Sequence, residues 1–228
     1  MKRDVIVIGG GAAGLFCAIE AGKRGRSTLV VERAGSIGKK IAISGGGRCN
    51  FTNIYTSADN FLSANPNFVK SALARYTPQD FIALVEKHRI GYHEKKLGQL
   101  FCDGSSRQII NMLRVECEAA AVEIRTDCRV SRVEKNADFR IETSQGAFES
   151  ASLVIATGGL SIPFAPAKSL RRFDASNLDR GGSKSCASCF RVTRPASTPS
   201  ARCSSLETGA PMSTGIRARF RICTSSKG

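Results

Sequence analysis

Several features that would mark a membrane or secreted protein are missing from the sequence. No apolar run reaches the roughly 18–20 residues that a membrane-spanning helix needs. Residues 1–4, three of which are charged, lead at once into a short strand-like apolar run, so a secretory signal is not expected. The sequence therefore argues against an integral membrane protein, and we expect no membrane partner.

Cysteine is plentiful but lacks the arrangement of a disulfide-stabilised or zinc-binding domain. The nine cysteines are an odd number, and their spacing is not that of a small disulfide framework. Cys186 and Cys189 have the spacing of half a zinc site, but no second pair and no histidine lies at ligand spacing. We interpret the cysteines as reduced thiols, expect no metal, and predict a cytoplasmic protein.

Acidic residues are scarce relative to basic ones, and the imbalance is concentrated near the C-terminus. The chain holds 34 Lys and Arg against 19 Asp and Glu, a net charge of +15. Residues 1–163 hold 22 basic and 16 acidic residues, whereas residues 164–228 hold 12 and 3. Such an excess suggests an anionic partner such as nucleic acid, but most of it lies in the shorter part.

Residues 164–228, the tail, also lack the apolar side chains that a folded unit needs. They contain 17 Ser and Thr but only 11 large apolar or aromatic residues, which keep neither a helical nor a strand period. So few apolar groups cannot offset the entropy of ordering the backbone, and the tail is predicted to be disordered. An alternative function is a non-enzymatic protein that binds nucleic acid through this basic tail, although the tail lacks interleaved aromatic residues for base stacking.

The first 163 residues are patterned, and they open with a strand, a helix and a second strand. Residues 4–8 form a strand-like run that is continuously apolar from Val5 on, as in a strand buried on both faces of a parallel sheet. A glycine-rich turn follows at 9–14, then a helix-compatible run that ends near Gly22 and Gly25, and a second strand at 28–32. This is a complete βαβ opening.

The turn after the first strand carries a dinucleotide-binding pattern. Gly9, Gly11 and Gly14 form G-x-G-x-x-G, which permits a tight turn, close approach of a pyrophosphate, and close packing of helix on sheet. Glu32 ends the second strand 18 residues after Gly14, where a carboxylate accepts hydrogen bonds from ribose hydroxyls. A glycine string alone is often only a turn, but this context favours dinucleotide binding.

The rest of the pattern predicts an α/β fold with a Rossmann-like parallel sheet and a small antiparallel segment. Helices are expected after Pro66, after Pro78 and over 106–120. Strand-like runs then occupy 128–133, 139–143, 147–149 and 152–156.

A second glycine-rich stretch, residues 45–53, offers a cluster of hydrogen-bond donors. Its glycines expose backbone N–H groups, and Arg48, Asn50, Thr52 and Asn53 suit a phosphate or a heteroaromatic carbonyl. The alternative interpretation is a surface loop without a ligand.

Other chemistry-bearing residues have ordinary structural interpretations beside the functional ones. Cys49 has a neighbouring arginine that favours a lowered thiol pKa, but a plain buried thiol explains it more simply. Lys40 is placed either to pair with a phosphate or to be solvated, and residues 157–159 either cradle a phosphate or end a strand. His88 lies on a helix face and is interpreted as packing or surface, and His93 receives no assignment.

The two glycine-rich stretches together resemble one bacterial flavoprotein family, the BaiN-like NAD(P)/FAD-dependent oxidoreductases. The Ser-Gly-Gly-Gly-Arg-Cys-Asn-Phe-Thr-Asn run at 44–53 is the specific part, whereas many flavoproteins share the fingerprint at 9–14. Residues 98–101 and 156–163 also fit the family. The resemblance covers residues 1–163 and stops there.

The resemblance implies an FAD-binding domain in a flavoprotein oxidoreductase. It implies the pyrophosphate on residues 9–14, the ribose on Glu32, adenine near the Val130 backbone, and the flavin near residues 48–53. Some members reduce carbon–carbon double bonds conjugated to ketones with hydride from a nicotinamide, so NAD(P)H is the implied donor and the substrate is an unassigned small molecule. The cofactor-binding residues predicted in this way are Gly9, Gly11, Ala12, Ala13, Gly14, Glu32, Arg33, Lys40, Gly46, Gly47, Arg48, Cys49, Asn50, Thr52, Asn53, Val130, Thr157, Gly158 and Gly159.

No catalytic side chain is assigned, because the flavin itself would carry the chemistry. The stretch at 48–53 argues against a third interpretation, a nicotinamide-only dehydrogenase. Family members are nearly twice as long as this chain, so we expect residues 1–163 to be a partial domain, with FAD held weakly or activity lost. Charge, composition and periodicity change together at Pro163, which leads to the hypothesis that residues 164–228 are translated out of frame. Nucleic acid is not expected as a partner of the patterned part.

Overall fold

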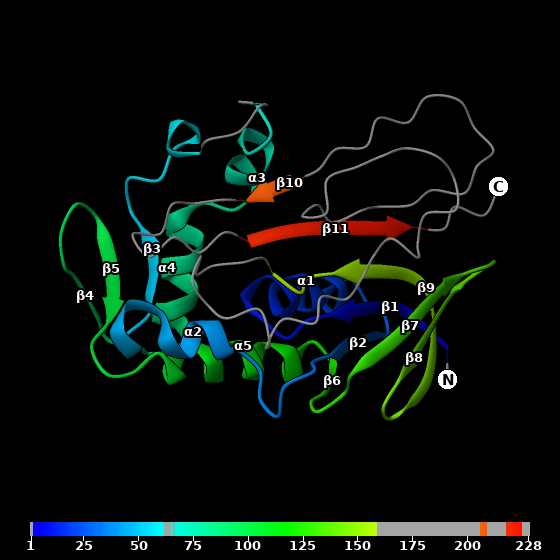
Figure 1. The fold of residues 1–228 in the computed structure, drawn as a ribbon. Helices are drawn as coiled ribbons and strands as arrows, with labels where there is room; N and C mark the ends of the chain where they lie inside the picture. The colour runs from blue at the N-terminus through cyan, green and yellow to red at the C-terminus, as the bar shows by residue number, and fades with distance from the viewer. Residues whose placement is uncertain (1, 62–64, 66, 159–205, 209–217, 225–228) are drawn as a thin grey trace, which may run out of the picture.

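The structure is a computed structural model, and it describes residues 2–61, 65, 67–158, 206–208 and 218–224 (Figure 1). Its centre is a sheet in the order β10-β11-β9-β1-β2-β6. Four strands of it are mutually parallel, namely β1 (Lys2–Ile8), β2 (Thr28–Val31), β6 (Glu123–Arg125) and β9 (Gly146–Ile155). This confirms the predicted α/β fold with a Rossmann-like parallel sheet.

Both faces of the parallel strands are buried, because successive side chains alternate between two apolar clusters. Val7, Val30 and Val154 pack into the cluster that includes helices α1 (Ala12–Lys23) and α5 (Arg107–Ala119). The neighbouring residues Ile6 and Leu153 pack into the cluster on the opposite face. The continuous apolar runs of the sequence therefore have the structural cause that was inferred for them.

A β-meander packs on the face of the sheet that carries Ile6 and Leu153. It consists of β7 (Val130–Lys135) and β8 (Phe139–Thr143), which pair antiparallel with each other and with the first half of β9. Phe139 and Ile141 are fully buried there against the strands. The small antiparallel segment predicted from alternation is confirmed, with β7 beginning and ending two residues later than the predicted strand.

The last two strands predicted in this part are a single strand in the structure. The sequence indicated separate runs at 147–149 and 152–156, with Ser150 and Ala151 between them. In the structure Ser150 is fully buried and its hydroxyl donates to the Ser152 carbonyl at 2.8 Å. With the hydroxyl satisfied internally, β9 continues through this point and pairs with β8 on one side and β1 on the other.

A separate three-stranded antiparallel sheet lies at the left of Figure 1, in the order β3-β5-β4. Its strands are β3 (Asn50–Asn53), β4 (Tyr92–Glu94) and β5 (Gln99–Cys102), and the sequence predicted none of them. Each is only three or four residues long, which is too short to give a clear alternation. The second glycine-rich stretch is therefore part loop and part strand.

Five further elements lie between β2 and α5 in the chain. Helix α4 (Pro78–Lys87) begins after Thr77 with proline at its first turn, as predicted. Helix α3 (Lys70–Arg75) is shorter than the apolar face that predicted it. The others are α2 (Lys39–Ile43) and the 3₁₀ turns η1 (Ser44–Gly47) and η2 (Ala58–Asn60).

The tail contributes two described strands, β10 (Leu206–Thr208) and β11 (Ala218–Thr224). They pair antiparallel with each other, and β11 pairs antiparallel with the outer edge of β9. These ten residues differ from the disorder predicted for the tail, because an open strand edge offers backbone partners to any extended segment. The rest of that prediction, Cys186 and Cys189 included, lies outside the described residues.

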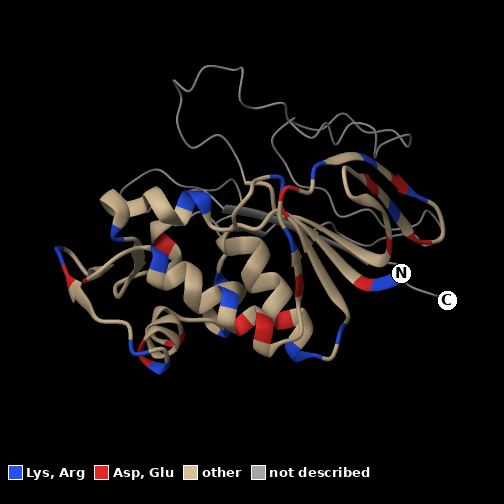
Figure 2. Cartoon of the chain, turned by 90° about the horizontal axis from the view of Figure 1, so that it is seen from below, with Lys and Arg blue, Asp and Glu red and all other residues tan. Residues whose placement is uncertain are grey.

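Two properties of the whole described part bear on its surroundings. None of its helices combines the length and apolar character of a membrane span. Basic and acidic residues are interspersed along the described part of the chain (Figure 2).

Candidate functional site

The fingerprint turn follows the end of β1, and its first and third glycines are required by close backbone contacts. Gly9 has φ +114°, and a Cβ there would lie 2.5 Å from the Ala156 carbonyl oxygen at the end of β9. A Cβ on Gly14 would lie 1.9 Å from the Gly9 carbonyl oxygen. The turn thus brings the carboxyl ends of β1 and β9 together with the start of α1, as the pattern predicted.

The second glycine of the fingerprint faces open space. A Cβ added to Gly11 would meet no atom within 4 Å. Gly11 is also the N-cap of α1, and in the described part of the chain no side chain caps this helix end. The first N–H groups of α1, including those of Ala12 and Ala13, are directed to this end, where the helix dipole favours negative charge. The arrangement fits a pyrophosphate.

Glu32 fixes the second strand end against the fingerprint. Its two carboxylate oxygens accept hydrogen bonds from the backbone N–H groups of Gly10 and Ala34, at 2.7 and 2.8 Å. Each oxygen has a further lone pair for a ribose hydroxyl. The Glu32 carbonyl accepts from the Cys128 N–H at 2.9 Å. Val130, the first residue of β7, follows this contact by two residues. Arg33 is exposed beside them.

Lys40 and the end of β9 meet at the neighbouring strand end. A Cβ on Gly158, which has φ +73°, would lie 3.3 Å from the Lys40 Nζ. Burial lowers the pKa of Lys40, because desolvation disfavours the ammonium form. Thr157 is exposed here, and Gly159 lies outside the described residues. Lys40 therefore lies beside Gly158, at the strand ends next to the fingerprint turn. From the sequence alone, Lys40 was interpreted either as a phosphate contact or as a solvated side chain.

The second glycine-rich stretch packs on the start of α5. The Ser106 N–H donates to the Gly47 carbonyl at 2.7 Å, and the Ser106 hydroxyl donates to the Ala42 carbonyl at 2.8 Å. Gly46 and Gly47 have positive φ, and added Cβ atoms there would meet nothing within 4 Å. Arg48 is exposed at the same place. The stretch thus presents bare backbone and one guanidinium to open space.

The two asparagines of this stretch already have partners within the chain. Asn50 is 4% exposed, and its amide group lies 3.0 and 3.2 Å from the carbonyls of Thr52 and Leu100, to which its NH₂ donates. The Asn53 Nδ2 donates to the Leu97 carbonyl at 2.8 Å, and its Oδ1 accepts from the Tyr55 N–H at 2.9 Å. These amides hold the β3–β5 sheet together, whereas Thr52 is half-buried beside them.

The thiol of Cys49 is a plain buried group. Burial raises its pKa, and a hydrogen bond with Ser44 only partly opposes that rise. Its neighbour Cys102 is also buried, which raises the pKa of Cys102 to about 12. The simpler interpretation of Cys49 agrees with this burial.

Both histidines lie within hydrogen-bonding distance of a carboxylate outside the fingerprint. His88 Nε2 lies 2.8 Å from a carboxylate oxygen of Glu116 on α5, which also pairs with Lys87 at 2.7 Å and Lys23 at 3.3 Å. His93 Nδ1 lies 2.6 Å from Asp103 Oδ1. His88 was interpreted as packing or surface, and its side chain is 17% exposed beside Glu116. The sequence held no sign of Glu116, because a buried carboxylate on an amphipathic helix looks like any exposed one.

The chain is similar to a family of Rossmann-domain proteins over most of its described length. The family described as HI0933-like protein Rossmann domain matches residues 3–171. A relative from Escherichia coli (strain K12), named Ribosomal RNA dihydrouridine synthase, is 52% identical over 165 residues, which are 72% of this chain and 41% of the relative. A relative from Clostridium scindens, named 3-dehydro-bile acid delta(4,6)-reductase, is 30% identical over 162 residues, which are 67% of this chain and 38% of the relative. The chain therefore spans about two fifths of these relatives.

Two solved structures share the fold. A 3-ketosteroid-delta4-(5alpha)-dehydrogenase from Rhodococcus jostii RHA1 is 17% identical with a TM-score of 0.52, covering 70% of this chain and 46% of its own. A glycine oxidase from Geobacillus kaustophilus is 16% identical with a TM-score of 0.50, covering 69% and 56%. At this identity the likeness concerns the fold alone, and it agrees with the predicted Rossmann-like sheet.

Proposed function

The chain belongs to the HI0933-like family of Rossmann-domain proteins, and on that premise we propose that it is the FAD-holding part of a flavoprotein reductase. The observation that carries this proposal is the space left over Gly11, at a helix N-terminus without a side-chain cap and beside the Glu32 carboxylate. A flavin dinucleotide has the pyrophosphate and ribose that these two features fit.

Each protein group has a separate task in this arrangement. The N–H groups at the start of α1 would bind the pyrophosphate, and Glu32 would accept from the adenosine ribose. The Lys40 ammonium, close to Gly158, would offset negative charge at the strand ends. The bare backbone of Gly46 and Gly47, with Arg48, would lie beside the ring system, where bound FAD accepts and donates hydride.

We propose that the reaction is reduction of a carbon–carbon double bond conjugated to a carbonyl. Two relatives support it through the chemistry that their names state. Dihydrouridine differs from uridine by two hydrogens across a ring double bond next to a carbonyl, and a delta(4,6)-reductase of a 3-dehydro compound saturates bonds conjugated to a ketone. The higher identity to the first relative makes a uridine base in ribosomal RNA the favoured substrate, with NAD(P)H as the donor of the hydride.

The cofactor part of the proposal is tested by titrating the full chain with FAD, followed by flavin fluorescence and by thermal unfolding. Gly11→Val fills the space over the turn at an ordinary φ of −85°, so we expect unchanged unfolding of the free chain and at least about a tenfold loss of FAD affinity. Glu32→Gln should weaken FAD binding, and Glu134→Gln, a surface control, should not. A wild-type chain that FAD neither binds nor stabilises would refute the proposal.

The reaction is tested separately from cofactor binding. Anaerobic addition of NADH or NADPH to the FAD-loaded chain should bleach the oxidised flavin absorbance, and a uridine-containing RNA should restore it. Return of the absorbance with an RNA whose uridines are already reduced to dihydrouridine would contradict the assigned substrate.

A further inference from the structure

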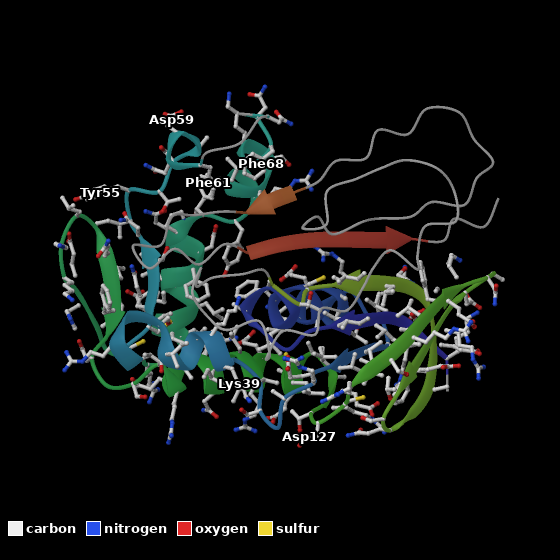
Figure 3. The ribbon with its side chains drawn as sticks, viewed as in Figure 1. Lys39, Tyr55, Asp59, Phe61, Phe68 and Asp127 are labelled. Atoms are coloured by element: carbon white, nitrogen blue, oxygen red, sulfur yellow. The ribbon has the colours of Figure 1, made fainter. Side chains whose placement is uncertain are left out.

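Building on the proposed function, we infer that the chain carries an RNA-docking surface at the turn between β4 and β5. The surface, called the tip below, consists of Tyr55, Lys95, Lys96 and Leu97. It projects at the left-hand end of the molecule in Figure 1, and Tyr55 is labelled at this end in Figure 3. The partner that its chemistry fits is single-stranded or loop RNA.

The tip is unusual for the apolar side chains that it exposes. Leu97 is 77% exposed and Tyr55 is 69% exposed, and they are two of the four large hydrophobic side chains that are exposed in the described part of the chain. Leu97 also has φ +50°, a left-handed conformation that costs energy for a leucine. A turn that serves only to connect two strands needs neither feature, because glycine or asparagine would relieve the backbone.

Hydrogen bonds fix this exposed turn in place. Asn53 binds the Leu97 carbonyl with its Nδ2 and the Tyr55 N–H with its Oδ1. The Gly98 N–H donates to Glu94 Oε1 at 2.7 Å, and the Gly98 carbonyl accepts from the Ile54 N–H at 2.9 Å. The tip is therefore preorganised, which lowers the entropy lost when a partner binds.

The charge and the rings of the tip suit a nucleic acid. Lys95 and Lys96 are both exposed, and the Lys95 Nζ lies 5.2 Å from the centre of the Phe101 ring. The nearby Glu94 carboxylate accepts a hydrogen bond from the Gly98 N–H at 2.7 Å. An exposed tyrosine stacks on an unpaired base, an aliphatic side chain contacts the next one, and lysines bind phosphates.

The tip is joined to the candidate cofactor site by a single short strand. β3 runs from Asn50 beside Arg48 to Asn53 at the tip, and β5 returns along it. At about 3.3 Å per residue the two ends of β3 are only about 10 Å apart. RNA held at the tip would have a neighbouring nucleotide within reach of residues 46–48, where the reducible base has to be.

The test measures binding of the full chain to a fluorescently labelled single-stranded RNA of 12 uridines at several salt concentrations. Tyr55→Ala should weaken binding about tenfold without changing the salt dependence, and Tyr55→Phe should preserve it, because stacking needs only the ring. Lys95→Ala with Lys96→Ala should lower the slope of log K against log salt by about 1.4, at about 0.7 per phosphate contact. Arg24→Ala with Arg26→Ala removes the same charge elsewhere and should leave affinity at the tip unchanged.

Ultraviolet crosslinking with mass spectrometry shows where the RNA lies, whatever the basic tail contributes to affinity. Crosslinks at residues 55 or 95–97 support the inference. The inference would be overturned by crosslinks confined to other residues, or by equal binding of the wild type and Tyr55→Ala. It would also be overturned if the tip variants changed only self-association, because the tip would then be a protein contact. FAD titration of the same variants separates the two proposals, since the tip can bind RNA in a chain that binds no FAD.

Discussion

Gly14 is a position where an added Cβ would clash with the backbone of the fingerprint turn. A Cβ there would lie 1.9 Å from the Gly9 carbonyl and 3.2 Å from Val7 Cγ1. We expect Gly14→Ala to lower the free energy of unfolding by about 2–3 kcal/mol, since the helix must move off the sheet. Gly11→Ala is the control, with nothing within 4 Å and an expected change within about 0.5 kcal/mol. Urea denaturation measures both, and similar losses would show that the fingerprint packs differently.

Glu116 makes the stability of the protein depend on pH. Its side chain is 4% exposed, and that burial raises its pKa, but hydrogen bonds from Lys87, His88 and Lys23 outweigh burial and lower the pKa to about 2. A depressed carboxyl pKa contributes stability that is present above the unfolded pKa of 4.5 and is lost as the pH falls toward 2.

Glu116→Gln should therefore cost about 2–3 kcal/mol at pH 7 and almost nothing at pH 2. Glu118→Gln on the same helix is the matched control, because Glu118 is 57% exposed, and it should cost less than about 0.5 kcal/mol at either pH. Denaturation at a series of pH values gives both differences. A cost for Glu116→Gln that does not shrink in acid would mean that packing, and not charge, is what the glutamate supplies.

Helix α4 depends on its first turn. The Asp80 N–H donates to the Thr77 Oγ at 3.2 Å, and the Thr77 N–H donates to Asp80 Oδ2 at 2.7 Å. Thr77→Ala removes the side-chain acceptor and should destabilise the helix by about 1 kcal/mol. Faster hydrogen exchange of the α4 amides would report this, and Gln79→Ala in the same turn should leave exchange unchanged.

At the scale of elements, the sequence predicted the helices and strands whose buried side chains give a clear apolar pattern along the chain. The strands at 4–8 and 28–32 were evident because both faces of the parallel sheet are apolar, and α5 because Ile109, Leu113 and Cys117 share one face. The β3-β5-β4 sheet could not be predicted, since its strands are only three or four residues long and β3 pairs with a strand that lies far along the chain. The continuity of β9 through Ser150 was also not predictable, because whether the Ser150 hydroxyl is satisfied depends on the fold.

The candidate site divides in the same way. The fingerprint and Glu32 were predictable because one local pattern specifies them and the local βαβ unit assembles them. Asn50 and Asn53 were predicted as donors to a ligand, but their amides already bond to the chain. Residue type shows that a donor is present, whereas only the fold shows what it faces. How these two asparagines relate to a cofactor stays a prediction.

At the scale of the whole molecule, β11 covers the edge of β9 that faces away from β1. β11 pairs with β9 from Arg221 to Thr224, and without it the β9 backbone would present unpaired N–H and C=O groups. A chain ending at residue 205 should therefore self-associate through β9, seen as a rise in sedimentation coefficient with protein concentration. The same truncation with Ile155→Pro should associate less, because the Ile155 N–H faces the open edge, whereas the next N–H along, that of Ala156, donates to Ile8 in β1. A truncated chain that stays monomeric would show that β11 is dispensable at this edge.

The pairing of β1 with β9 also means that the newly made chain cannot complete its central sheet until residues 149–155 have been synthesised. Lys2 aligns with Glu149, so the strand that is synthesised first waits for a neighbour that is synthesised near the end of the patterned part. At about 5–20 residues per second, roughly 7–30 s separate the two on the ribosome. Through that interval β1 can pair only with β2, and its other edge is open to whatever the cell supplies. The moment at which residues 149–155 emerge therefore decides whether the domain closes on itself or on a neighbour.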